Sequence, residues 1–301
     1  MPAILTEGLS KSYGDVVALA GIDLRVEAGE VFALLGPNGA GKTTAVEILE
    51  GYRRPSAGKV SVLGTDPVAG GQRLRQRIGI VLQEAGVQPY LTVAEAVEMF
   101  RGFYPHPRPT DELITLVGLE DKRNERVNKL SGGQRRRLDV ALGLAGDPDL
   151  LFLDEPTTGF DPSARRRAWE MIAGLHGLGK TVFLTTHYMD EAQSLAGRVA
   201  IIVQGRIVAE GPPDTLRADS HETRIRFRAP MDQQLPGDLA PRRTGEAIEI
   251  VTSDATGALH RLTTWALERK VHLDGLTVSH ASLEDIYLEL TSPPPQTDER
   301  R

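Results

Sequence analysis

A glycine-rich segment that ends in lysine and threonine is the strongest candidate for chemistry in this chain. Its residues are Gly36, Pro37, Asn38, Gly39, Ala40, Gly41, Lys42, Thr43 and Thr44. Backbone N–H groups of such a loop can cradle an anion, and a helix that starts near Gly41 adds its positive end. We expect Lys42 to reach the β- and γ-phosphates of a nucleotide and the Thr43 hydroxyl to bind Mg²⁺. We also expect Gly36, Gly39 and Gly41 to adopt positive φ, which lets the backbone approach the ligand.

Two carboxylates follow a second apolar run. Residues 150–153 are all apolar, and Asp154 and Glu155 come directly after them. Asp154 is a candidate Mg²⁺ ligand because this ion prefers hard oxygen atoms. Glu155 points in another direction and is a candidate catalytic base that accepts a proton from an attacking water. Taken alone, the pair is also compatible with an acidic turn before Pro156.

Gln83 and His187 also follow apolar runs, residues 78–82 and 181–186. Ligands of open α/β sheets lie beyond the carboxyl ends of the strands, so both side chains are candidates for the same site. Gln83 would meet the phosphate or the metal ion, and His187 would contact the γ-phosphate. In isolation Gln83 is more typical of a strand cap, and His187 of a core histidine.

A second candidate anion site lies in the middle of the chain. It comprises Ser131, Gly132, Gly133 and Gln134, and residues 135–144 follow with helical periodicity. A serine hydroxyl and free N–H groups at a helix N-terminus suit an anion. The segment cannot reach the phosphates at Lys42 while it lies on a separate arm. The simplest geometry is therefore that it serves the nucleotide of another copy, and the alternative is a glycine-containing helix cap.

One aromatic residue precedes the phosphate loop by about two dozen positions. Tyr13 belongs to the segment Ser12-Tyr13-Gly14. An exposed ring at this place can stack on a base, because every base offers a π-face. A tyrosine packed on a sheet edge is the alternative interpretation.

These side chains need a sheet to position them, and the hydrophobic pattern predicts one. Apolar runs favour buried strands at 31–35, 78–82, 150–153 and 181–186, and residues 22–26 alternate as a half-buried strand does. Between residues 92 and 147 the pattern becomes helical. Thr92 and Glu95 form a capping-box sequence at the start of this part. An all-helical segment is thus inserted between two α/β stretches.

The composition is that of an ordinary globular protein. The chain has 301 residues, of which 40% are hydrophobic, and its net charge is −6. This charge gives no basic footprint for nucleic-acid binding. The chain has no cysteine, which excludes disulfides and thiolate metal sites and fits a reducing compartment. No apolar run approaches the ~20 residues that span a bilayer, and the first residues do not have the pattern of a signal peptide.

Taken together and in order, these motifs resemble those of the ATP-binding-cassette (ABC) ATPase family. The match comprises the phosphate loop, the Q-loop Gln83, an LSGGQ signature at 130–134, a Walker B strand at 150–155, a D-loop that ends at Asp161 and the switch His187. The resemblance implies an α/β P-loop NTPase fold with an N-terminal antiparallel β-subdomain and an inserted helical subdomain. One departure is Phe160, where the family's D-loop more often has leucine.

The resemblance also implies functional roles. Tyr13 would stack on adenine, and Ser131 and Gly133 would contact the γ-phosphate of ATP held by a second copy. Gln83, Lys42 and His187 would join Glu155 in catalysis, and Gln83 would join Thr43 and Asp154 at Mg²⁺. ATP and Mg²⁺ are the expected cofactors. The expected partners are a second copy and membrane permease subunits, with no nucleic acid, at the cytoplasmic face of the cell membrane.

Residues outside the cassette indicate the subfamily. The cassette covers residues 3–215, with its helical part at about 84–147, and residues 217–290 read as a small C-terminal α/β domain before a disordered tail at 291–301. This second part resembles ATP-binding subunits of ABC-2 type exporters, including daunorubicin and multidrug-resistance ATPases. Export of a drug-like or lipophilic substrate is the expected function. An importer subunit, or a soluble ABC ATPase acting on ribosomes or DNA, is the alternative.

Overall fold

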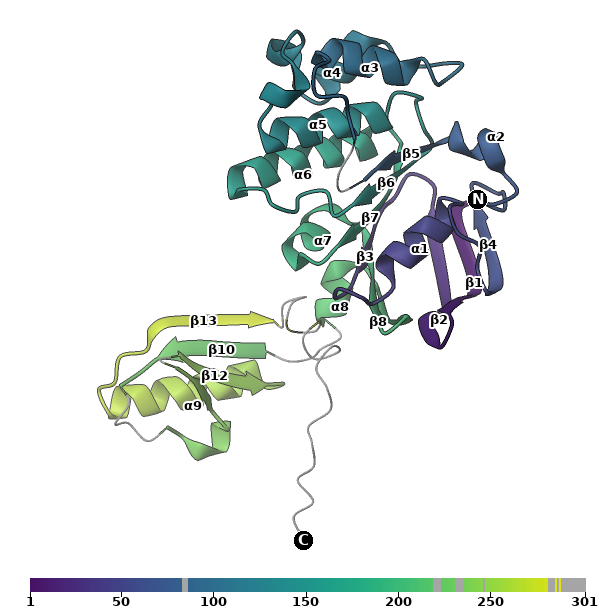
Figure 1. The fold of residues 1–301 in the computed structure, drawn as a ribbon. Coiled ribbons are helices and arrows are strands. Elements are labelled where there is room, and N and C mark those ends of the chain that lie inside the picture. Colours follow the sequence, from purple (N-terminus) through teal and green to yellow (C-terminus); the bar gives the residue numbers. More distant parts are fainter. Residues whose placement is uncertain are drawn as a thin grey trace. The chain divides into compact units, whose positions relative to one another are not determined.

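The computed structural model describes residues 1–82, 86–218, 223–230, 235–245 and 247–280, together with residues 285 and 287. The chain divides into two compact units, Met1–Pro212 and Pro213–Arg301. Figure 1 shows the elements of both units.

A largely parallel sheet forms the centre of the first unit. Among its described residues, six strands lie in the order β5-β6-β7-β3-β8-β9, and only the β8–β9 pair is antiparallel. Their bounds are β3 Val31–Leu35, β5 Ile78–Val81, β6 Leu150–Asp154, β7 Thr181–Thr186, β8 Arg198–Val203 and β9 Arg206–Gly211. The strands β3, β6 and β7 are buried almost throughout, which explains the apolar runs at 31–35, 150–153 and 182–184.

The register of this sheet places the candidate site. Leu35 of β3 lies opposite Thr186 of β7, and Asp154 of β6 lies opposite Thr185. The carboxyl ends of three neighbouring strands are therefore level. The chain leaves them into the helices α1 Lys42–Leu49, α6 Pro162–Gly177 and α7 Met189–Leu195. The predicted strand ends thus meet at one edge of the sheet.

An antiparallel sheet at the N-terminus shares a core with the parallel one. Its order is β2-β1-β4, with bounds β1 Pro2–Tyr13, β2 Val16–Glu27 and β4 Ala57–Val62. Ile4 and Leu24 of this sheet, Ile48 of α1 and Phe32 of β3 belong to one buried cluster. Helix α1 therefore packs between the two sheets, which fixes the phosphate loop at its N-terminus.

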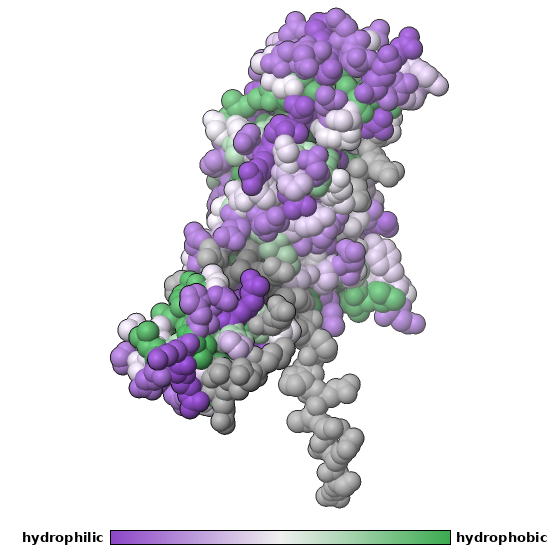
Figure 2. All heavy atoms as spheres, turned by 90° about the vertical axis from the view of Figure 1, so that its left-hand side faces the viewer, coloured by the Kyte–Doolittle hydropathy of each residue, from purple (hydrophilic) through white to green (hydrophobic). Residues whose placement is uncertain are grey.

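Helices dominate the segment between β5 and β6. They are α3 Val93–Arg101, α4 Thr110–Leu116 and α5 Gly132–Gly143, with short 3-10 turns at Glu120–Lys122 and Val127–Lys129, while α2 Gly71–Arg75 precedes β5. The predicted capping box is confirmed, because Thr92 accepts from the Glu95 N–H and Glu95 accepts from the Thr92 N–H. On the face in Figure 2, hydrophilic side chains cover most of this segment, at the top of the view. None of the described helices could span a membrane.

The second unit contains a second antiparallel sheet. Its described strands lie in the order β11-β12-β10-β13, with bounds β10 Thr223–Arg228, β11 Arg242–Thr244, β12 Ala247–Thr252 and β13 Asp274–His280. Helix α9 Ala255–Glu268 packs on one face through Leu262, against Ile225 and Ile250. The remaining elements are α8 Pro213–Ala218 and a 3-10 turn at Gly237–Leu239.

The sequence predicts two strands and two helices in this unit, and three of these four elements lie within the described residues. The two predicted strands and the first predicted helix are present, the helix beginning two residues earlier than its pattern indicates, at Ala255. Strand β13 is not predicted by its sequence. The predicted closing helix at 282–288 lies outside the described residues apart from 285 and 287. The predicted disordered tail, 291–301, lies wholly outside them.

Candidate functional site

The phosphate loop joins the buried strand β3 to helix α1, as its sequence predicts. Gly39 and Gly41 adopt positive φ, 78° and 107°. Gly36 does not, so that part of the expectation is wrong. A side chain at Gly36 is excluded for another reason, because its Cβ would lie 2.5 Å from the backbone oxygen of Ile202 in β8. The first glycine therefore permits close packing of the loop on the sheet, and the later ones permit its turn.

The Lys42 side chain lies within its own loop. Its Nζ donates to the carbonyl oxygens of Gly36 at 2.7 Å and Pro37 at 3.2 Å. The residue is only 7% exposed, and this burial lowers the pKa of its ammonium group, while the charges of Glu155 and Asp154 act in the opposite direction. A phosphate would supply the negative charge that two neutral carbonyls do not.

Lys42, Thr43 and both carboxylates line one pocket. Its volume is about 370 Å³, and the other described residues that line it are Ala18, Pro37, Asn38, Gly39, Gly41 and Thr44. Asp154 at the end of β6 accepts a hydrogen bond from the Thr185 hydroxyl of β7. The Thr43 hydroxyl and the Asp154 carboxylate are hard oxygen donors of the kind that Mg²⁺ prefers. Among the described residues, no group of three or more His, Cys, Asp or Glu side chains could hold a metal ion by itself.

Glu155 has an uncommon backbone conformation for its residue type. Its φ is +45°, in the left-handed region that a non-glycine residue seldom occupies. Its N–H donates to the Thr185 carbonyl at 3.1 Å. Its side chain contacts the Thr158 hydroxyl and the His187 ring, the latter through Nδ1 at 3.1 Å. The turn thus directs the Glu155 carboxylate toward His187, whose side chain is 35% exposed and so is not a core histidine.

Two other residues are predicted for this site, and of these the structure describes only Tyr13, which does not line the pocket. Tyr13 ends β1 and is 40% exposed, with Lys11 Nζ at 5.2 Å and the Arg53 guanidinium at 5.5 Å from its ring centre. The exposure of the Tyr13 side chain is compatible with base stacking. Gln83 lies outside the described residues, and β5 ends just before it, at Val81.

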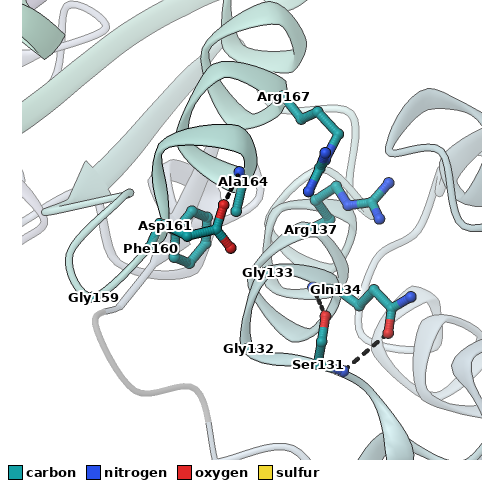
Figure 3. Close-up of a pocket in the computed structure, with 10 residues that line it drawn as sticks. All are labelled: Ser131, Gly132, Gly133, Gln134, Arg137, Gly159, Phe160, Asp161, Ala164 and Arg167. Atoms are coloured by element: carbon teal, nitrogen blue, oxygen red, sulfur yellow. Dashed lines mark hydrogen bonds between the residues drawn. The ribbon is translucent and has the colours of Figure 1, made fainter.

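The signature segment forms a second pocket, shown in Figure 3. Ser131 caps helix α5, which begins at Gly132 rather than at the predicted Arg135. The Ser131 hydroxyl accepts from the Gln134 N–H at 3.3 Å, and the Gln134 side chain accepts from the Ser131 N–H at 2.9 Å. The pocket is about 440 Å³, and its described lining also includes Gly132, Gly133, Arg137, Gly159, Phe160, Asp161, Ala164 and Arg167. Of the described residues, none lines both pockets.

Sequence reasoning missed the threonines that hold the carboxylates. Thr185 binds both the Asp154 side chain and the Glu155 backbone, and Thr158 binds the Glu155 carboxylate. Thr157 donates to the fully buried Glu191 at 2.7 Å and so ties the loop after Glu155 to α7. A threonine next to a strand end is too common to reveal such a role. Only the pairing of β6 with β7 brings Thr185 beside Asp154.

Comparisons with known proteins agree across most of the chain. A family model described as "ABC transporter" matches residues 19–158, and one described as "ABC transporter domain-containing protein-like, C-terminal domain" matches residues 223–282. The daunorubicin resistance ATP-binding protein DrrA3 of Streptomyces coeruleorubidus is 37% identical over 99% of this chain and 97% of its own length. The Nod factor export ATP-binding protein I of Burkholderia thailandensis is 39% identical over 94% of this chain and 95% of its own.

Solved structures support the fold in the same way. A dimeric ATP-binding cassette in a post-hydrolysis state with ADP and Pi aligns with a TM-score of 0.62 at 27% identity, over 69% of this chain and 98% of that one. The cbiO1 protein of Clostridium perfringens aligns with a TM-score of 0.66 at 30% identity, over 73% of this chain and 92% of that one. The predicted P-loop cassette fold is thereby confirmed.

Proposed function

Because this chain belongs to the ABC transporter family, we propose that it is the ATP-hydrolysing subunit of an exporter and drives a separate membrane permease. The observation that carries the proposal is the grouping of Lys42, Thr43, Asp154 and Glu155 around one pocket, with the signature serine in another. The first pocket holds the lysine, hydroxyl and carboxylate groups that can bind a nucleoside triphosphate and its metal ion. The second pocket has the hydrogen-bond donors that one copy would contribute to the phosphates bound by its neighbour.

We assign the chemistry of the first pocket to individual side chains. Lys42 and the loop N–H groups bind the phosphates, and Tyr13 stacks on adenine. Thr43 and Asp154 hold Mg²⁺, with Gln83 as a further ligand, and the ion neutralises phosphate charge when bound. Glu155 accepts a proton from the attacking water, and His187 orients the Glu155 carboxylate and contacts the γ-phosphate.

A second copy of the chain completes the site in this proposal. Ser131, Gly132, Gly133 and Gln134 of one copy face the ATP that is bound by the other copy's loop. The dimeric cassettes among the structural relatives support an assembly of two copies. We propose the cassette as residues 3–215 and the accessory domain as residues 217–290.

Export is proposed because the similarity to relatives extends over nearly the whole chain. Two of these relatives carry names that refer to daunorubicin resistance and Nod factor export, and both match over at least 94% of this chain. By analogy the cargo is drug-like or lipophilic, and the chain works at the cytoplasmic face of the membrane. Purification of the native complex tests this assignment. A co-purifying polytopic membrane protein is expected, whereas ribosomal RNA or DNA would contradict it.

Substitution of Lys42 tests the nucleotide site itself. A charge pair at about 4 Å is worth roughly 4 kcal/mol at an effective dielectric near 20. We therefore expect Lys42→Ala to lower ATP hydrolysis by at least about 100-fold, measured as phosphate release. Lys59→Ala is the matched control, because Lys59 is 85% exposed and only pairs with Glu7 at 3.6 Å. Equal activity of Lys42→Ala and wild type would contradict the assignment.

A further inference from the structure

Arg136 is a buried arginine that lies five residues after the signature serine on the same helix. It is 7% exposed, and its guanidinium donates to three backbone carbonyls outside α5. The acceptors are Leu82, Asp154 at 2.7 Å and Pro156 at 3.2 Å. One side chain thus joins the signature helix to the end of β5, the end of β6 and the loop after it.

Two of these acceptors flank the residue proposed as the catalytic base. The Asp154 carbonyl belongs to the peptide that precedes Glu155, and the Pro156 carbonyl lies one residue beyond Glu155. Glu155 itself has φ +45°. A non-glycine residue in this region keeps its conformation only when its surroundings fix it from several sides. The Thr185 carbonyl fixes the Glu155 N–H, and Arg136 holds the carbonyls on either side.

Nearby carboxylates stabilise the positive charge of the Arg136 guanidinium. Burial lowers the pKa of its guanidinium, while Asp139, Asp154 and Glu191 favour the charged form. The planar fork of arginine can donate in several fixed directions at once, which the single ammonium of lysine cannot do. Helix α5 also packs against β5, so a movement of the helix would reach the three carbonyls directly (Figure 1).

We propose that Arg136 is a positioning residue for hydrolysis, which couples the signature helix to the backbone turn that aims Glu155. Ser131 at the start of α5 faces the partner's nucleotide, whereas Glu155 faces the nucleotide of its own chain. Arg136 therefore connects the two half-sites within one chain. The inference rests on the proposed roles of Ser131 and Glu155.

The test distinguishes an effect on the orientation of the Glu155 carboxylate from an effect on nucleotide binding. Arg136→Met removes the donors at similar length, and Arg136→Lys keeps the charge with one donor group. A misplacement of a catalytic group by about 1 Å can cost on the order of 100-fold. We expect kcat for ATP to fall by roughly 10- to 100-fold in both variants, with KM and nucleotide affinity within about threefold of wild type.

Arg198→Lys is the matched structural control. Arg198 is also partly buried and donates to a backbone carbonyl, that of Arg25, but it lies at the amino end of β8, whereas the site lies at the carboxyl ends of the strands. We expect Arg198→Lys to lower the thermal midpoint without lowering kcat. Turnover within twofold of wild type in folded Arg136→Met or Arg136→Lys would overturn the inference. So would a loss of kcat that follows the thermal midpoint equally in all three variants.

A second measurement uses the Glu155→Gln background. Since Arg136 does not line the signature pocket, Arg136→Met in this background should still form an ATP-dependent dimer. Loss of the dimer would contradict a positioning role. If the wild-type chain neither hydrolyses ATP nor responds to Lys42→Ala, the proposed function fails first, and that result is distinct from a failure of Arg136 alone.

Discussion

At the scale of single residues, the site combines charged groups with neutral hydrogen-bond partners. Lys42 is held by two carbonyls, and Asp154 by a threonine hydroxyl. Burial without a formal counter-charge costs free energy unless hydrogen bonds compensate. Each of these side chains can therefore bind a ligand of opposite charge. Lys42 would bind a phosphate, and Asp154 would bind a metal ion.

A buried glutamate near this group makes the stability depend on pH. Glu50 ends helix α1 and is 5% exposed, and its pKa is raised to about 8, chiefly by burial and then by Asp154 and Glu47. The folded state therefore binds a proton that the unfolded chain, with a pKa of 4.5, releases. This contribution to stability is full below about pH 4.5 and is lost as the pH rises toward 8, at up to roughly 1.4 kcal/mol per pH unit.

Urea unfolding measures this effect directly. Between pH 5.5 and 8.5 we expect wild type to lose more stability than Glu50→Gln, because glutamine cannot ionise. Asp139, whose pKa burial raises to about 6, is unchanged in both proteins and cancels in the comparison. Parallel pH profiles for the two proteins would contradict the assignment to Glu50.

At the scale of elements, two helices begin with the same hydrogen-bonded box but serve different purposes. Thr92 caps α3 and Ser131 caps α5, each with a reciprocal partner three residues on. We expect Thr92→Ala and Ser131→Ala to destabilise the fold by a similar amount, about 1 kcal/mol. Only Ser131→Ala should also lower ATP hydrolysis. A comparable loss of hydrolysis in Thr92→Ala would mean that the cap acts through stability alone.

The turn of the phosphate loop depends most on the glycine at position 41. At Gly41 φ is +107°, and a Cβ would lie 2.5 Å from the Ala18 carbonyl oxygen. We expect Gly41→Ala to displace the loop and weaken nucleotide binding by at least tenfold, measured with a fluorescent nucleotide. Gly174→Ala provides the control. A Cβ added at this position of α6 would meet no atom within 4 Å, so the change should stabilise the helix by about 1 kcal/mol.

The sequence predicts those elements whose signal is local. Continuous apolar runs indicate the central strands, and residues 36–44 indicate the loop between β3 and α1. The reason for Gly36 is not local, because it depends on Ile202 of a strand distant in sequence. Arg136 is hidden for the same reason: three consecutive arginines at 135–137 have the same local pattern, and only the tertiary fold separates the one that reaches the catalytic turn.

At the scale of the whole molecule, the proposed mechanism requires two copies. We expect Glu155→Gln to lower hydrolysis by about 100-fold or more, because the water loses its base. The same variant should accumulate as a dimer in ATP and Mg²⁺, seen by size-exclusion chromatography. Glu170→Gln, at an exposed position of α6, should behave as wild type. A monomeric Glu155→Gln protein with full activity would refute both the base and the dimer.

The strand order of the central sheet also affects how the chain folds. Strand β3 pairs with β7 and β8, so residues 31–35 meet residues that are synthesised 151 positions later in β7 and 166 positions later in β8. Parallel pairings of such long range form slowly, because the chain must close large loops first. Nucleotide affinity therefore develops only when folding is almost complete. ATP at 100 times its dissociation constant would then add about 2.7 kcal/mol to the finished fold alone, which makes the nucleotide a selective stabiliser of correctly paired chains.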